Sequence, residues 1–245
     1  MTILLTLSTL PVFAGSSSVS GSVIFEGKAP TPPILNTRGE KYCEEIHAKN
    51  PIHADGAAIG SKGEFEYIFV WIDNSPAGDY PAPEEKAYLS QKNCRYEQPV
   101  IAFMTNQTLE IHNLDDTTHN VRGFARNNKI FNFGQPAGLP PRTRTFKNPE
   151  TPIRIKCDVH SWMNSWAFIL PHPFFDVTGP EGTFEIKDLP AGTYTLKSWH
   201  EKLGEQSQEI TVGATPTSSI LFTYSRSGKK GMTRKAPTDT HNRGK

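Results

Sequence analysis

Short segments rich in β-branched and aromatic residues recur along the chain and constrain its fold more than any other feature. Each is bounded by Gly, Pro, Asn or Asp, a pattern typical of strands joined by turns. No long helical period is present, and residues 83–90 suit at most one or two helical turns. With 20 Pro and 19 Gly, the chain is predicted to be all-β and of sandwich type. The clearest strand-like segments are residues 19–25, 64–73, 108–112, 153–157, 166–170, 183–186, 193–199, 206–212 and 218–224.

The beginning of the sequence predicts export. Residues 3–14 form an apolar run that ends in Ala14 and is followed by Gly15 and three serines, as in a secretory signal peptide. We therefore predict a signal peptide over residues 1–14, truncated at its start because no basic residue precedes the apolar run. The run is shorter than the roughly 20 residues of a membrane span. We expect a periplasmic or secreted protein with no transmembrane segment in the mature chain.

The end of the sequence has a different composition. Residues 225–245 contain seven Lys and Arg and one acidic residue, among many Gly, Ser and Thr. Such a segment cannot bury an apolar core, so we predict a disordered basic tail. Nothing in the sequence has the pattern of a nucleic-acid-binding module, and no nucleic-acid partner is expected.

The heptapeptide CDVHSWM places a thiol, an imidazole and a thioether at three-residue spacing, in Cys157, His160 and Met163. These are three of the four ligands of a type 1 (blue) copper site, where two His and one Cys bind in a near-trigonal plane and a Met binds weakly on the axis. His119 is the candidate for the second histidine. Zinc suits this set less well, because structural zinc sites use further Cys or His in place of a thioether.

The three cysteines are an odd number for an exported protein. A disulfide between Cys43 and Cys94 would leave Cys157 free to bind a metal, and we favour that pairing. Spacing alone leaves the other pairings open, and each of them would consume Cys157 and abolish the metal site.

The ligand loop lies between two strand-like segments and resembles that of cupredoxins of the amicyanin and plastocyanin type, as in bacterial methylamine-utilisation-type cupredoxin proteins. The resemblance implies a cupredoxin-like Greek-key sandwich over residues 88–171 with one type 1 copper ion. It makes His119 and His160 the nitrogen ligands, Cys157 the thiolate and Met163 the axial ligand. It also makes Asn120 the neighbour that steadies the ligand loops and the sulfur.

Residues 177–196 resemble a different module, the carboxypeptidase regulatory-like or transthyretin-like sandwich. In that module Gly182 and Gly192 would form turns, and Phe184 and Tyr194 would point inward. Residues 172–224 are too few for its usual strands, and residues 18–87 would complete it. We therefore predict a discontinuous sandwich, 18–87 plus 172–224, with the cupredoxin domain inserted; two domains in simple succession are the alternative.

These resemblances imply an exported one-electron carrier. Electrons would pass by outer-sphere transfer through an exposed edge of His160, with Trp162 near the exit and an unidentified redox protein as partner. Two alternatives stay open: a copper-holding or sensing module without a redox partner, and a structural β-sandwich interaction protein. An enzyme is not expected, because the sequence has no nucleophile–base motif and no set of histidines for a second copper centre.

Overall fold

A computed structural model describes residues 16–54 and 58–226. The predicted signal peptide, residues 1–14, and residues 227–245 of the predicted basic tail lie outside the described residues. Within the described ranges, no helix has the length and apolar character needed to cross a membrane.

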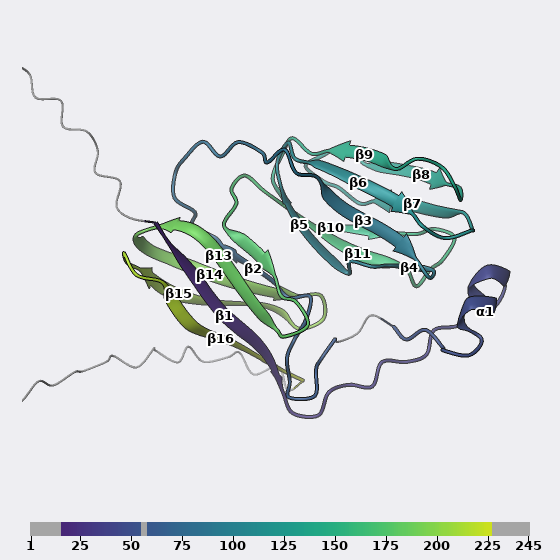
Figure 1. The fold of residues 1–245 in the computed structure, drawn as a ribbon, viewed down its shortest axis with the longest axis horizontal. Coiled ribbons are helices and arrows are strands. Elements are labelled where there is room, and N and C mark those ends of the chain that lie inside the picture. Colours follow the sequence, from purple (N-terminus) through teal and green to yellow (C-terminus); the bar gives the residue numbers. More distant parts are fainter. Residues whose placement is uncertain (1–15, 55–57, 227–245) are drawn as a thin grey trace, which may run out of the picture.

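The fold is all-β, as predicted: within the described ranges, strands alternate with turns and one short helix, α1, interrupts them (Figure 1). The elements are β1 (Ser16–Glu26), α1 (Lys41–His47), β2 (Phe69–Ile72), β3 (Ala87–Lys92), β4 (Arg95–Tyr96), β5 (Val100–Met104), β6 (Thr108–Asn113), β7 (His119–Gly123), β8 (Phe131–Gln135), β9 (Arg142–Thr145), β10 (Glu150–Lys156), β11 (Asn164–Leu170), β12 (Phe175–Val177), β13 (Thr183–Pro190), β14 (Gly192–His200), β15 (Gly204–Val212) and β16 (Thr217–Ser225).

Two sheets contain strands from both ends of the described chain, and we call them the flanking sandwich. One has the order β13-β1-β16 and the other the order β12-β2-β14-β15. Every second residue of β14 is buried, because side chains of a strand alternate between the two faces of its sheet. The buried residues of both sheets share one apolar core, in which Phe65, Phe184 and Tyr224 are large members.

Two further sheets are built from the strands β3 to β11, and we call them the middle sandwich. Their orders are β5-β11-β10-β7-β8 and β4-β3-β6-β9. The core between them includes Phe103, Ile111 and Ile153, and it continues up to Cys157 and Met163. Residues that carry metal-ligand chemistry therefore lie at one end of an ordinary apolar core. The division into two domains, with the boundaries given above, stays a prediction.

The two sandwiches meet through strands that are buried on both faces. All four residues of β2 are buried: Val70 and Ile72 belong to the core of the flanking sandwich, while Phe69 faces a cluster shared with the middle sandwich. There the Phe69 ring stacks on Phe168 of β11, with ring centroids 4.0 Å apart. Burying an aromatic side chain of this size contributes roughly 1.5–3 kcal/mol, so this contact fixes one sandwich against the other.

Two local expectations differ from the structure. Residues 83–90 do not form helical turns: Ala87–Lys92 is the strand β3, which pairs in parallel with β6. Conversely, α1 was not expected, because Lys41–His47 has one buried residue, Cys43, and no apolar periodicity. Pairing with β6 makes residues 87–92 a strand, and the disulfide of Cys43 holds α1 in place. Neither interaction leaves a local pattern in the sequence.

Gly182 offers a direct test of the turn before β13. Its φ is +66°, and a Cβ atom there would lie 2.7 Å from the Val23 carbonyl oxygen. We expect Gly182→Ala to lower the free energy of unfolding by about 2 kcal/mol, because both the left-handed backbone and the contact penalise a side chain. The matched control is Gly179→Ala, where a Cβ meets nothing within 4 Å. Urea unfolding of both variants measures the difference, and equal stability would contradict this account.

Candidate metal centre

The pairing of β7 with β10 brings the candidate ligands together. Lys156 of β10 lies directly opposite Arg122 of β7 in antiparallel register. Cys157 follows β10 and His119 opens β7, so both residues lie at the same end of the sheet. The loop that follows closes on itself, since the backbone N–H of Cys157 donates to the Met163 carbonyl at 3.2 Å and that of Met163 to the His160 carbonyl at 2.9 Å.

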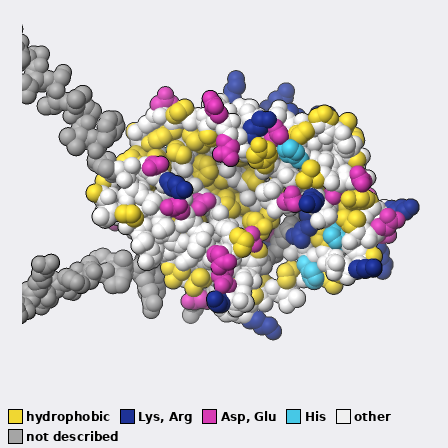
Figure 2. Space-filling view, viewed as in Figure 1, with side chains coloured by type: hydrophobic (Ala, Val, Ile, Leu, Met, Phe, Trp, Pro, Cys, Tyr) yellow, Lys and Arg dark blue, Asp and Glu magenta, His cyan; other side chains and the backbone are white. Residues whose placement is uncertain are grey.

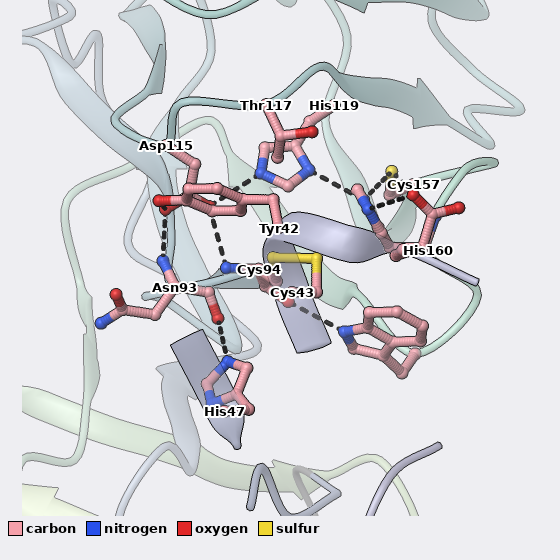
Figure 3. The surroundings of a disulfide bond; sticks show 12 residues. Tyr42, Cys43, His47, Asn93, Cys94, Asp115, Thr117, His119, Cys157 and His160 are labelled. Atoms are coloured by element: carbon pink, nitrogen blue, oxygen red, sulfur yellow. Dashed lines mark hydrogen bonds and ion pairs between the residues drawn. A yellow bond between two sulfur atoms is a disulfide. The ribbon is translucent and has the colours of Figure 1, made fainter. Parts of the chain in front are cut away.

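Three of the four predicted ligands converge on one point (Figure 3). The Nδ1 atoms of His119 and His160 are 2.9 Å apart, and the Cys157 Sγ is 3.5 Å from the His160 Nδ1. A ligand atom from each residue lies within 4.8 Å of the others, and all three side chains are buried. Met163 is buried in the same core cluster as Cys157, and its backbone bonds to Cys157 and His160 keep it in the same loop.

The Cys157 sulfur sits in surroundings that favour its thiolate. It accepts hydrogen bonds from the backbone N–H groups of Asn120 and His160, both at 3.3 Å. Burial raises the pKa of the thiol, but hydrogen bonds from His119, His160 and these backbone groups outweigh it and lower the pKa to about 6. Near neutral pH the Cys157 side chain is therefore a thiolate, the form that binds metals.

Asn120 connects the ligand loop to the neighbouring strands, as the family resemblance implies. Its side-chain amide donates to the Asn132 Oδ1 at 2.6 Å and to the Phe133 carbonyl at 3.2 Å. Its Oδ1 accepts from the backbone N–H of Asp158 at 3.1 Å. One side chain thus ties β8 to the residue after Cys157, which restrains the position of the sulfur.

Asp115 contacts the candidate ligand His119, and the sequence did not lead us to expect this contact. Its Oδ2 is 2.8 Å from the His119 Nε2, and its two oxygens accept the backbone N–H groups of Asn93 and Cys94. Burial raises the pKa of this carboxyl, but the bond to His119 and the backbone donors hold it below its ordinary value. The carboxylate therefore fixes His119 with Nδ1 turned toward the site. An Asp four residues before the candidate His is the only signal in the sequence.

The predicted disulfide is present: Cys43 of α1 is bonded to Cys94, and Cys157 is a free, buried cysteine. In the described residues, three groups of possible metal donors lie close together, and the disulfide shows which of them has a free thiol. The other two groups, around His160 and around Asp115 with His119, each include Cys94. A sulfur in a disulfide is not a thiolate and is a poor ligand, so the group with Cys157 is the competent one.

The prediction that an edge of the His160 ring is exposed is wrong. His160 is 0% exposed, because residues 40–47 lie over it; we call this segment the cover. A Glu40 carboxylate oxygen lies 3.6 Å from the His160 Nε2, and the disulfide sulfurs lie within 4.8 Å of a His160 nitrogen. Trp162 packs on another side, with ring centroids 5.2 Å apart. Direct outer-sphere contact at His160 is blocked in this structure.

The cover is held mainly by its disulfide. Cys43 is the one buried residue of α1, and Ile46 is 36% exposed. The remaining contacts are polar: the Tyr42 hydroxyl donates to Asp115 at 3.4 Å, and the His47 Nε2 lies 2.9 Å from the Asn93 carbonyl oxygen. With so little apolar burial, α1 has few contacts that would keep it in place without the covalent bond.

Comparisons with known proteins cover less than half of the chain. No family model matches the chain, and no curated protein matches it. Among solved structures, amicyanin from Paracoccus versutus is 13% identical and aligns with 41% of this chain and 96% of that chain, with a TM-score of 0.30. A purple cupredoxin from Nitrosopumilus maritimus is 17% identical and aligns with 34% of this chain and 99% of that chain, also at 0.30.

A third similar structure is a copper-containing nitrite reductase from Thermus scotoductus. It is 16% identical and aligns with 39% of this chain at a TM-score of 0.32. The alignment spans 25% of the length of the reductase.

Titration of the metal-free protein tests the electrostatics of the site. We expect a thiolate absorbance near 240 nm, absent from Cys157→Ser, with a midpoint near pH 6 in place of the ordinary value of 9. Because the folded pKa is depressed, the thiolate contributes stability that is complete above pH 9 and is lost as the pH falls toward 6. His119→Leu should raise the midpoint, since it removes a hydrogen-bond donor to the thiolate. A wild-type midpoint above pH 8 would contradict the assignment.

Removing the disulfide tests the cover. We expect Cys43→Ser/Cys94→Ser to expose His160 and to lower the free energy of unfolding by about 2–4 kcal/mol, because the bond closes a loop with a sequence separation of 51. Hydrogen–deuterium exchange at the imidazole Cε1, read by mass spectrometry, should become about tenfold faster or more at His160. His200, buried in the flanking sandwich, is the internal control and should not change. Unchanged exchange at His160 would show that the cover stays without its disulfide.

Proposed function

We propose that the chain binds one type 1 copper ion through His119, Cys157, His160 and Met163 and carries single electrons. The observation that supports this most directly is the convergence of two imidazole nitrogens and a low-pKa thiolate at one buried point. Soft thiolate and thioether donors together with imidazole are the set that copper takes in electron-transfer sites.

The donor spacing fits a single ion. Metal–nitrogen bonds are about 2.0–2.1 Å and metal–sulfur bonds about 2.3 Å for a first-row ion such as zinc, so two donors on one ion are at most roughly 4.4 Å apart. The Nδ1–Nδ1 distance of 2.9 Å and the Sγ–Nδ1 distance of 3.5 Å lie within that limit. Copper bound there would supply a one-electron Cu(II)/Cu(I) couple.

The protein's own contribution is to hold the donors still. Asp115 orients His119, Asn120 restrains the segment after Cys157, and the loop hydrogen bonds fix His160. A donor set that does not move between oxidation states lowers the rearrangement needed for each transfer, and this supports a carrier. A structural interaction protein makes no use of such rigidity, whereas a copper-holding module would share it and is separated from a carrier by its redox behaviour.

We propose a carrier and not an enzyme, working in a periplasmic or secreted setting. A disulfide persists in an oxidising compartment, which supports that location. All candidate metal-binding groups in the described ranges share residues of this one centre. A redox protein is the proposed partner, and binding to it would be weak and brief, as is usual for small electron-transfer interfaces.

Copper titration of residues 15–245 tests the proposal. We expect Cu(II) to give an intense thiolate-to-copper absorption band with narrow copper hyperfine splitting in electron paramagnetic resonance. Cys157→Ser should abolish the band, because it removes the only free thiol of the chain. The matched control, Cys43→Ser/Cys94→Ser, should keep it. A colourless wild-type protein would overturn the copper assignment, and an irreversible couple in voltammetry would favour the copper-holding alternative.

A further inference from the structure

With the edge of His160 covered, electrons must reach a partner by another side of the centre. The described residues offer a surface next to Cys157. Lys156 directly precedes Cys157, and Arg122 lies opposite Lys156 on β7. Both side chains point outward, because their neighbours Ile155 and Val121 belong to the core of the middle sandwich.

This surface belongs to the most basic part of the sequence. Residues 122–156 contain eight of the 26 Lys and Arg of the chain but one of its 25 Asp and Glu. That acid, Glu150, is buried and accepts the backbone N–H groups of residues 126–128, so it offers little negative charge to the surface. The eight residues are Arg122, Arg126, Lys129, Arg142, Arg144, Lys147, Arg154 and Lys156. Five of them are brought together by the structure, and we call these the basic face: Arg122, Arg154 and Lys156 lie on the outer side of β7 and β10, and Arg142 and Arg144 lie against Phe133 of β8, the strand that pairs with β7. In the view of Figure 2, Lys and Arg side chains are spread over the molecule, with several at the right-hand end near α1.

The charges of Arg142, Arg144 and Lys156 remain available to a partner. Arg142 and Arg144 have their guanidinium carbons 4.8 and 4.9 Å from the centre of the Phe133 ring, a contact that holds them in place without neutralising them. Within the described ranges, neither these two nor Lys156 forms a salt bridge with a carboxylate. Two cations directly opposite each other on paired strands, as Arg122 and Lys156 are, destabilise a sheet. Asp158, 3.6 Å from the Arg122 guanidinium, offsets part of that cost, and an acidic partner would relieve the rest.

Apolar side chains accompany these charges. Phe124 is 40% exposed under the Arg122 guanidinium, which lies 4.7 Å from the ring centre. Ile130 is 62% exposed and Val159, two residues after Cys157, is 46% exposed. An interface needs such apolar contacts inside a charged rim; Val159 lies close to Cys157 in sequence, while Phe124 and Ile130 lie at the other end of the β7–β8 pair, beyond Gly123 and Phe131.

Hydrogen bonds connect this surface to the sulfur. The backbone N–H of Asn120 donates to the Cys157 Sγ, and the Asn120 side chain donates to Asn132. Asn132 in turn donates to Asp158 at 3.3 Å, and Asp158 is 3.6 Å from the Arg122 guanidinium. A short bonded route therefore leads from the centre to the basic face without passing through His160.

We infer that the basic face is the docking surface for an acidic redox protein, which exchanges one electron with the centre on the Cys157 side. This inference rests on the proposed copper carrier and names its partner by charge. Complementary charge steers such partners together and raises the association rate, most strongly at low salt.

The test uses the full copper-loaded chain and two small redox probes of opposite charge. One electron passes from the reduced protein to hexacyanoferrate(III), giving hexacyanoferrate(II), or to tris(phenanthroline)cobalt(III), giving the cobalt(II) complex. Arg122→Glu/Lys156→Glu should slow the first reaction about tenfold at low salt and accelerate the second. The control, Lys28→Glu/Lys187→Glu, makes the same change in charge on the flanking sandwich and should alter each rate less than twofold.

Other outcomes separate this inference from the proposed function. If no copper band forms, the copper carrier itself fails. If the band and couple are intact but the reversal variant reacts like the control, the basic face is not the docking surface. A groove of about 660 Å³ beside Trp162 is the competing route, and rates that fall in Trp162→Leu but not in the reversal variant would assign the exit to it.

A copper-independent measurement checks the kind of partner. Metal-free protein should bind an acidic cytochrome b5 domain, seen as NMR shift changes confined to the basic face and weakened by 0.5 M NaCl. The reversal variant should lose these changes, and the control should keep them. Absence of shift changes in the wild type would overturn the inference. So would tighter binding to duplex DNA than to the cytochrome at 150 mM salt.

Discussion

The centre depends on one strand pairing, that of β7 with β10. This antiparallel contact brings together residues from parts of the chain more than thirty positions apart, with Lys156 opposite Arg122, and it sets where both strands end. Since side chains alternate along a strand, the register that sends Val121 and Ile155 into the core also sends Arg122 and Lys156 to the surface. The same pairing thus places His119 beside Cys157 and puts positive charge directly outside them.

The cover adds a second constraint on this centre. A copper site needs donors that are fixed and screened from water, and the disulfide between Cys43 and Cys94 closes one side of it at the cost of access to His160. The cover also reaches the neighbourhood of His119, because the Tyr42 hydroxyl donates to Asp115, as does the backbone N–H of Cys94, the disulfide partner of Cys43. Since Asp115 orients His119, contacts at the cover bear on a candidate ligand through this carboxylate.

The sequence was most informative where local pattern and structure agree. The ligand spacing in 157–163 identified a loop between two strands, and strands with strong alternation such as β14 and β15 were recognised. The strand β3 was missed because its sequence, AYLSQK, is poor in β-branched residues and its place is decided by parallel pairing with β6. The cover was missed because it is a contact through space that no spacing in the chain encodes, and the contact of Asp115 with His119 because its one signal, an Asp four residues before the His, is weak. The ligand roles of His119, Cys157, His160 and Met163 stay predictions.

Charge distribution connects the fold to the choice of partner. Basic residues concentrate in 122–156, while acids predominate in the rest of residues 16–226, and the pairing of β7 with β10 brings Arg122 and Lys156 of this range side by side. Such an arrangement orients an approaching acidic protein before contact, because the long-range field acts at encounter while short-range packing acts after it. The side it presents first is the one that adjoins Cys157. The covered His160 and the basic face therefore act together. The cover blocks approach to the centre through His160, and the positive charge favours approach on the Cys157 side.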